Sequence, residues 1–143
     1  METIDRGIPD IMITLQANRR VTESKVLSII QKTNRSKMSP SLGMIRLVKG
    51  YYGPMDKPGN TEYIGGYAEV DYNYMKLARL LINSGGTHML GTHNLTKIAE
   101  LNREFKGMHE RIWLGYLYYL KDYYMLQLQK HKELSGFYII PQI

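Results

Sequence analysis

A chain of 143 residues with 43% hydrophobic and 22% charged residues can fold as one globular domain with a sizeable core. The absence of cysteine excludes disulfides, thiol catalysis and thiolate metal sites, and it fits a reducing compartment. The formal net charge of +6 favours anionic partners such as nucleotides, but the cations are scattered along the chain, so we expect no specific nucleic-acid binding.

Five short apolar or β-branched runs are typical of buried strands. They are IMITLQA (11–17), MIRLVKG (44–50), THMLGT (87–92), RIWLGY (111–116) and GFYIIP (136–141). Between them lie four segments with helical spacing of apolar residues, at 22–33, 70–86, 95–105 and 117–134. Strand and helix therefore alternate, which predicts an α/β fold with a parallel sheet and crossover helices.

Capping residues indicate where these helices begin and end. Thr22, Asp71 and Asn94 are the expected N-caps of the first three helices, and Gly85-Gly86 is expected to end the second. The first helix places four apolar residues on one side: Val26, Leu27, Ile29 and Ile30.

Polar residues at the strand ends are the expected binding site, because ligands of parallel α/β sheets gather where strands lead into helices. The strand ends that carry them are 16–20, 49–52 and 92–94. Arg46 lies inside an otherwise apolar strand, so it is either a cation with a salt-bridge partner or a ligand-binding group. The segment 51–67, with two prolines and four glycines, is expected to be a long loop. We expect no metal site, because the histidines lack a third ligand at suitable spacing.

Four motifs resemble the catalytic barrel of proline dehydrogenase, a flavoenzyme with a distorted (β/α)8 barrel. They are LQANRR, MIRLVKGYYG, EVDYNYMKLARLLINSGG and GTHNLTKI, in the family's order and spacing. The likeness runs from about Ile11 to Asn94 and continues more weakly through RIWLGYLYYLKD and FYIIPQI. It implies a partial (β/α)8 barrel, with about five parallel strands alternating with four helices. Residues 1–143 would form a single domain equivalent to the family's last five strands.

The resemblance also implies a cofactor and a reaction. The family uses FAD to oxidise L-proline to pyrroline-5-carboxylate and passes the electrons to a quinone. By resemblance, Arg46 would be the catalytic residue, placed at the reactive edge of the flavin to stabilise negative charge. The residues implied to bind FAD are Gln16, Arg46, Val48, Lys49, Gly50, Thr92, His93 and Asn94.

The chain departs from the family pattern at several positions. Tyr51 replaces a small residue beside the cofactor, and Gly115 stands where the family has a glutamine that contacts FAD. The resemblance places the family's substrate lysine before Met1 and its paired arginines, which clamp the proline carboxylate, after Ile143. A proline-like substrate would therefore need an additional partner chain. The alternative is a non-catalytic structural or assembly protein derived from the barrel.

Chain length predicts open sheet edges. A closed eight-stranded barrel needs roughly 200 residues or more, so five strands would leave two edges unpaired. Unpaired edges invite pairing with another chain. We therefore expect an open partial barrel, a homo-oligomer or a partner chain that covers the edges, or a rearrangement of the end strands.

No apolar run approaches the ~20 residues of a membrane span. The first ten residues, METIDRGIPD, contain acidic residues where a transit peptide would be basic. We therefore expect an intracellular protein, cytoplasmic rather than mitochondrial.

Overall fold

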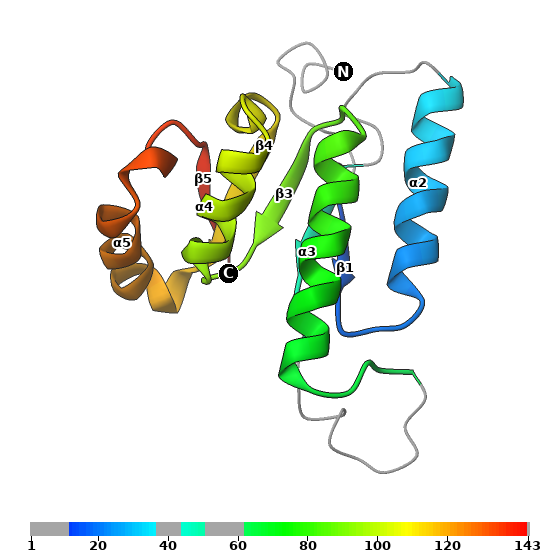
Figure 1. The fold of residues 1–143 in the computed structure, drawn as a ribbon, viewed down its shortest axis with the longest axis horizontal. Coiled ribbons are helices and arrows are strands. Elements are labelled where there is room, and N and C mark those ends of the chain that lie inside the picture. The colour runs from blue at the N-terminus through cyan, green and yellow to red at the C-terminus, as the bar shows by residue number, and fades with distance from the viewer. Residues whose placement is uncertain (1–11, 37–43, 51–61, 143) are drawn as a thin grey trace.

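The computed structural model describes residues 12–36, 44–50 and 62–142. Within them, five strands alternate with four α-helices (Figure 1). The strands are β1 (Met12–Gln16), β2 (Met44–Val48), β3 (His88–Gly91), β4 (Ile112–Leu117) and β5 (Ile139–Gln142). The helices are α2 (Thr22–Ser36), α3 (Tyr67–Asn83), α4 (Leu95–Glu104) and α5 (Lys121–Lys130). None of these helices combines the length and the apolar character that crossing a membrane requires.

The strands form one parallel sheet in the order β1-β2-β3-β4-β5. Each strand connects through a helix to the next strand along the sheet. Right-handed crossovers that always advance in the same direction place their helices on the same face. Figure 1 shows α3 and α4 in front of the strands. In the described residues β1 and β5 each have one strand neighbour, so the sheet is open at both edges. The predicted α/β fold and partial (β/α)8 barrel are confirmed.

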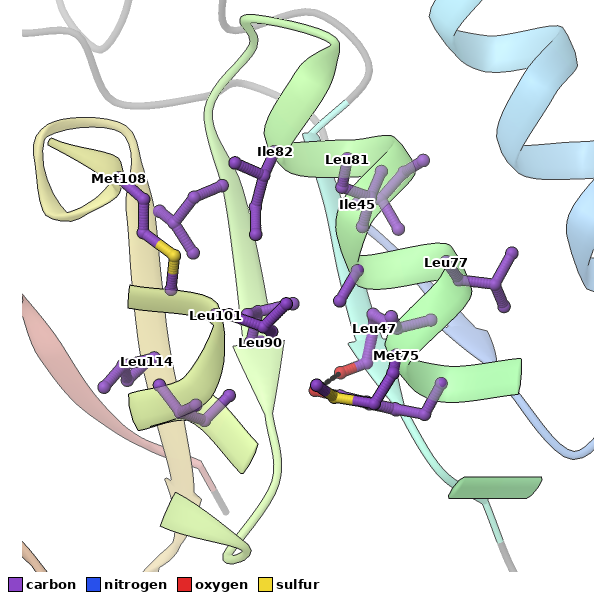
Figure 2. Packing of buried hydrophobic residues seen from close by; sticks show 14 of the residues in the cluster. Ile45, Leu47, Met75, Leu77, Leu81, Ile82, Leu90, Leu101, Met108 and Leu114 are labelled. Atoms are coloured by element: carbon purple, nitrogen blue, oxygen red, sulfur yellow. Dashed lines mark hydrogen bonds between the residues drawn. The ribbon is translucent and has the colours of Figure 1, made fainter. Parts of the chain in front are cut away.

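The two faces of β2 have different roles, because successive side chains of a strand point to opposite sides. Ile45 and Leu47 are fully buried beneath α3, in one cluster with Leu77 of that helix (Figure 2). Arg46 and Val48 alternate with them and line a cavity. One strand therefore supplies both the core and the site, which explains how a cation fits within a core strand.

The start of α3 differs from the prediction. The helix begins at Tyr67 behind Gly66, whose φ of 82° is left-handed, and Val70 in its first turn is fully buried. Asp71 is therefore not the N-cap, because the apolar face begins before it. The predicted end is confirmed, since Gly85 follows the helix with a φ of 80°.

α2 also differs in detail from its predicted pattern. Thr22 is its first residue, and the Thr22 hydroxyl donates a hydrogen bond to the Gln16 carbonyl, so Thr22 ties the helix to β1 instead of capping it. Val26 is fully buried as expected, but Leu27 is 46% exposed. Ile29 packs partly against the core. The buried stripe is narrower than predicted because α2 lies at the β1 edge of the sheet, where few elements surround it.

The C-terminal elements are the least well predicted. The expected helix 117–134 is α-helical only from 121 to 130 and is flanked by 3₁₀ turns at Tyr118–Leu120 and Lys132–Leu134. It starts late because Leu117 is still part of β4 and pairs with Gln142. The strand expected at 136–141 is shifted to Ile139–Gln142. Sheet pairing has overridden local helical spacing in this region.

A buried polar cluster closes the amino ends of the strands around His88. Its Nδ1 accepts a hydrogen bond from the Ile45 amide at 3.0 Å, and the Ser84 hydroxyl lies 3.1 Å from Nε2. Because Nδ1 is an acceptor, the neutral ring carries its proton on Nε2 and donates it to Ser84. Burial, assisted by the charge of Arg111, lowers the pKa of His88 to about 4. His88 is therefore an uncharged structural residue at neutral pH.

Two fully buried tyrosines differ in their hydrogen bonds. The Tyr74 hydroxyl donates to the Leu47 carbonyl at 3.3 Å, whereas the Tyr124 hydroxyl has no partner in the described part of the chain. We expect Tyr74→Phe to lower the free energy of unfolding by about 1 kcal/mol and Tyr124→Phe to raise it by about 1 kcal/mol. Chemical denaturation at constant pH would measure both changes. Shifts of the same sign would contradict the assigned bonding.

Candidate functional site

A cavity of about 440 Å³ lies at the carboxyl ends of the strands, on the sheet face opposite the core. Its lining residues are Gln16, Arg46, Val48, Lys49, Gly50, Gly91, Thr92, His93, Gly115, Leu117 and Gln142. Seven of the eight predicted cofactor residues are among them, all except Asn94. The strand ends that the sequence predicted as a binding site therefore border a cavity. Tyr51 and most of the predicted loop 51–67 lie outside the described residues.

Asn94 serves the helix rather than the cavity. Its Oδ1 accepts a hydrogen bond from the Lys97 amide at 3.4 Å, which confirms the predicted N-cap of α4. The Thr92 hydroxyl accepts from the Asn94 amide at 3.2 Å. Thr92 lines the cavity and Asn94 lies behind it, so the turn between β3 and α4 supports the lining.

Arg46 has no counter-charge among the residues that the structure describes. Its Nη1 donates to the Thr14 hydroxyl at 3.3 Å, while its buried Nε has no hydrogen-bond partner. Within residues 12–36, 44–50 and 62–142 no carboxylate pairs with it, so the salt-bridge alternative is not supported. Burial lowers the pKa of the guanidinium, yet an arginine keeps its proton in proteins. A partly desolvated positive charge of this kind favours an anionic ligand.

Lys49 differs from Arg46 because its charge is compensated. Its Nζ lies 2.7 Å from Oδ1 of Asp71 on α3. This ion pair is the role of Asp71 in place of the predicted cap. It ties the start of α3 to the end of β2, and it leaves Arg46 as the stronger anion-binding group of the cavity.

Gly50 permits close packing at the end of β2. Its φ of 102° is left-handed, and a Cβ at this position would collide with the side chain of Asn18. Asn18 is fully buried, and its backbone N–H donates a hydrogen bond to the Lys49 carbonyl at 2.9 Å. The glycine therefore holds the ends of β1 and β2 together as well as lining the cavity.

His93 links β3 to β4. Its Nε2 accepts a hydrogen bond from the Leu117 amide at 3.1 Å, and its ring meets Tyr124 edge to face at 5.6 Å. Burial lowers the pKa of His93, which favours the neutral ring. Because Nε2 is an acceptor, the proton of the neutral ring lies on Nδ1. His93 can therefore donate one hydrogen bond through Nδ1.

The cavity also contains residues that sequence reasoning missed: Gly91, Leu117 and Gln142. Gly91 and Gly115 follow the paired residues Leu90 and Leu114, so the two glycines are neighbours across β3 and β4. The repeated Leu-Gly step in HMLG and IWLG was a signal for this pair. Gln142 had no such signal, because its position depends on the pairing of β5.

Solved structures of proline utilization A proteins share this fold. A bifunctional proline utilization A protein matches 95% of this chain with a TM-score of 0.69 and 18% identity. The protein from Bdellovibrio bacteriovorus, inactivated by N-propargylglycine, matches 93% with a TM-score of 0.70 and 17% identity. A third structure, with proline bound in remote sites, matches 95% with a TM-score of 0.67 and 19% identity.

This chain therefore shares its fold with part of each of these proline utilization A structures. The predicted resemblance is therefore confirmed for the fold. This chain spans 14%, 14% and 15% of the lengths of the three proline utilization A chains. No protein-family model matches the sequence, and no curated protein matches it.

Proposed function

We propose that the chain is a proline dehydrogenase-like flavoprotein that holds FAD in the cavity at the carboxyl ends of its strands. The observation that carries the proposal is Arg46, a partly buried cation that lines the cavity and has no carboxylate partner within the described residues. In this proposal residues 1–143 correspond to the last five strands of the family's barrel. FAD, when bound, would supply the hydride acceptor for oxidation of L-proline to pyrroline-5-carboxylate.

The lining fits a flavin in shape and in hydrogen bonding. The neighbouring glycines Gly91 and Gly115 add no side chains of their own to the sheet face, and the flat carboxamide of Gln142 lies over Gly115, so a planar ring would lie against that amide. Gln16 offers an amide and His93 offers Nδ1–H as donors. Arg46 would stabilise the negative charge that a reduced flavin carries. Val48 would form an apolar wall beside it.

A proline-like substrate would need groups beyond this lining. A carboxylate is bound most strongly by a bidentate arginine. Among the described residues that line the cavity, Arg46 is the one arginine, and the proposal assigns it to the cofactor. We therefore expect no proline turnover by this chain alone, and we propose that a partner chain supplies the carboxylate clamp.

The β1 edge supports a role for a partner. Met12 is 47% exposed and Ile13 is 38% exposed on this open edge strand. Exposed apolar edge strands favour pairing with another chain. The same observation favours the second candidate function, a non-catalytic structural or assembly protein. Light scattering after size-exclusion chromatography would show whether the protein is a homo-oligomer.

Uptake of FAD separates the two candidate functions. The purified protein, as isolated and after incubation with FAD and removal of excess cofactor, should show the visible absorption of a bound flavin. Addition of L-proline should not bleach that absorption unless the partner chain is present. A protein that takes up no FAD under either condition would overturn the flavoprotein proposal and leave the structural role.

A further inference from the structure

Gln142 reaches across the sheet to cover a glycine. Its backbone lies at the end of β5, where it pairs with Leu117 of β4. Its carboxamide lies over Gly115, because a Cβ at residue 115 would be 2.9 Å from both Cδ and Nε2 of Gln142. A Cβ at Gly91, one strand further, would be 3.6 Å from Oε1. The amide thus lies over this pair of glycines in the cavity lining.

The polar atoms of this amide are poorly satisfied. Nε2 lies 2.8 Å from Sδ of Met89, and a thioether is a weak acceptor. Oε1 accepts no hydrogen bond from the described residues. A carboxamide that faces a cavity with one weak contact retains both a donor and an acceptor for a ligand.

We propose that Gln142 is a binding residue for the flavin ring, carried over Gly115 from the neighbouring strand. This inference rests on the proposed FAD function. The flavin ring system has carbonyl acceptors and an imide N–H donor along one edge, and a carboxamide offers the complementary donor and acceptor. Gln142 therefore exchanges its sulfur contact for hydrogen bonds to the ring.

Gly115 leaves the space that the amide of Gln142 fills. Any side chain at residue 115 would begin where the amide of Gln142 lies, and it would also meet Sδ of Met89 at 2.9 Å. The pairing of Leu117 with Gln142 holds the backbone of β5 in register. A glutamine amide therefore lies above position 115 although position 115 itself has no side chain.

The test compares FAD affinity in three variants that can be purified without cofactor. Gln142→Leu should bind FAD about five- to tenfold more weakly than the wild type, because it loses neutral hydrogen bonds but keeps its volume. Its visible flavin spectrum should also shift, which a purely structural role would not cause. Gln129→Leu is the matched control, since Gln129 is exposed on α5 outside the cavity, and it should bind FAD as the wild type does.

The double variant Gly115→Gln/Gln142→Gly places the amide on β4, with the flexible Met89 side chain shifting to admit the new Cβ, and should recover part of the lost affinity. Tight FAD binding by the wild type with the same affinity and spectrum in Gln142→Leu would overturn this inference alone. Failure of the double variant to recover affinity, with both variants folded by circular dichroism, would also overturn it. No FAD binding by the wild type would overturn the proposed function and this inference with it.

Discussion

Arg46→Met is expected to weaken FAD binding by about ten- to hundredfold, because hydrogen bonds to a charged group contribute about 1.5–3 kcal/mol. The same substitution should leave the free energy of unfolding of the cofactor-free protein unchanged or slightly higher. The Arg46 guanidinium is partly desolvated and its Nε has no partner in the described residues, so the substitution removes a desolvation cost that offsets the lost hydrogen bond to Thr14. Titration with FAD and chemical denaturation would measure the two effects on one protein.

Arg79→Met is the matched control for Arg46→Met. Arg79 pairs with Glu104 at 3.0 Å on the outer surface, away from the cavity. Its loss should leave FAD affinity unchanged and should lower stability by at most about 1 kcal/mol, as for other exposed ion pairs. A larger loss of stability from Arg46→Met than from Arg79→Met would mean that the hydrogen bond to Thr14 makes Arg46 a structural residue, and the anion-site assignment would fail.

Acid should destabilise the fold through His88. Its pKa is about 4 in the folded protein, against 6.5 for an ordinary histidine. Between these two pH values the unfolded chain binds a proton that the folded protein does not, so stability falls as the pH decreases. The contribution of His88 is complete above pH 6.5, is lost progressively towards pH 4, and amounts to about 3 kcal/mol in total.

Urea denaturation at several pH values between 4 and 7 would measure this contribution. His88→Asn keeps an acceptor for the Ile45 amide but cannot titrate, so its stability should depend less steeply on pH. His109→Asn is the control, since His109 is exposed, and it should keep the wild-type slope. An unchanged slope in His88→Asn would assign the acid sensitivity to other groups.

The fold could be predicted where local pattern and tertiary packing agree. The strands around Ile45 and Leu90 are short apolar runs, and α4 has both an N-cap at Asn94 and a buried apolar face. The apolar runs, the N-cap and the apolar helix face are local patterns, each within a few residues of the strand or helix that it predicts. The start of α5 was mispredicted because Leu117 has helical spacing in the sequence but pairs with Gln142 in the sheet.

The candidate site could be predicted only in part, because the pairing of its charged side chains depends on residues that are far apart in the sequence. Lys49 and Thr92 follow the ends of β2 and β3, and the rule for parallel sheets brings such residues together, whereas Arg46 lies within β2. The state of each charge depends on residues that are remote in sequence. Lys49 meets Asp71 across the start of α3, whereas Arg46 meets the Thr14 hydroxyl. No local pattern distinguishes the paired cation from the unpaired one.

The sequence by itself determined the alternation of strands and helices, the strand ends that carry polar residues, and the resemblance to a proline dehydrogenase barrel. These features depend on hydrophobic periodicity and on motifs of consecutive residues. Only the tertiary structure decided which of the two cations pairs with a carboxylate of the described residues and that Gln142 covers Gly115. The first depends on how α3 packs at the end of β2, which brings Asp71 to Lys49. The second depends on the register between β4 and β5, because a shift of one residue would turn Gln142 to the opposite face of the sheet.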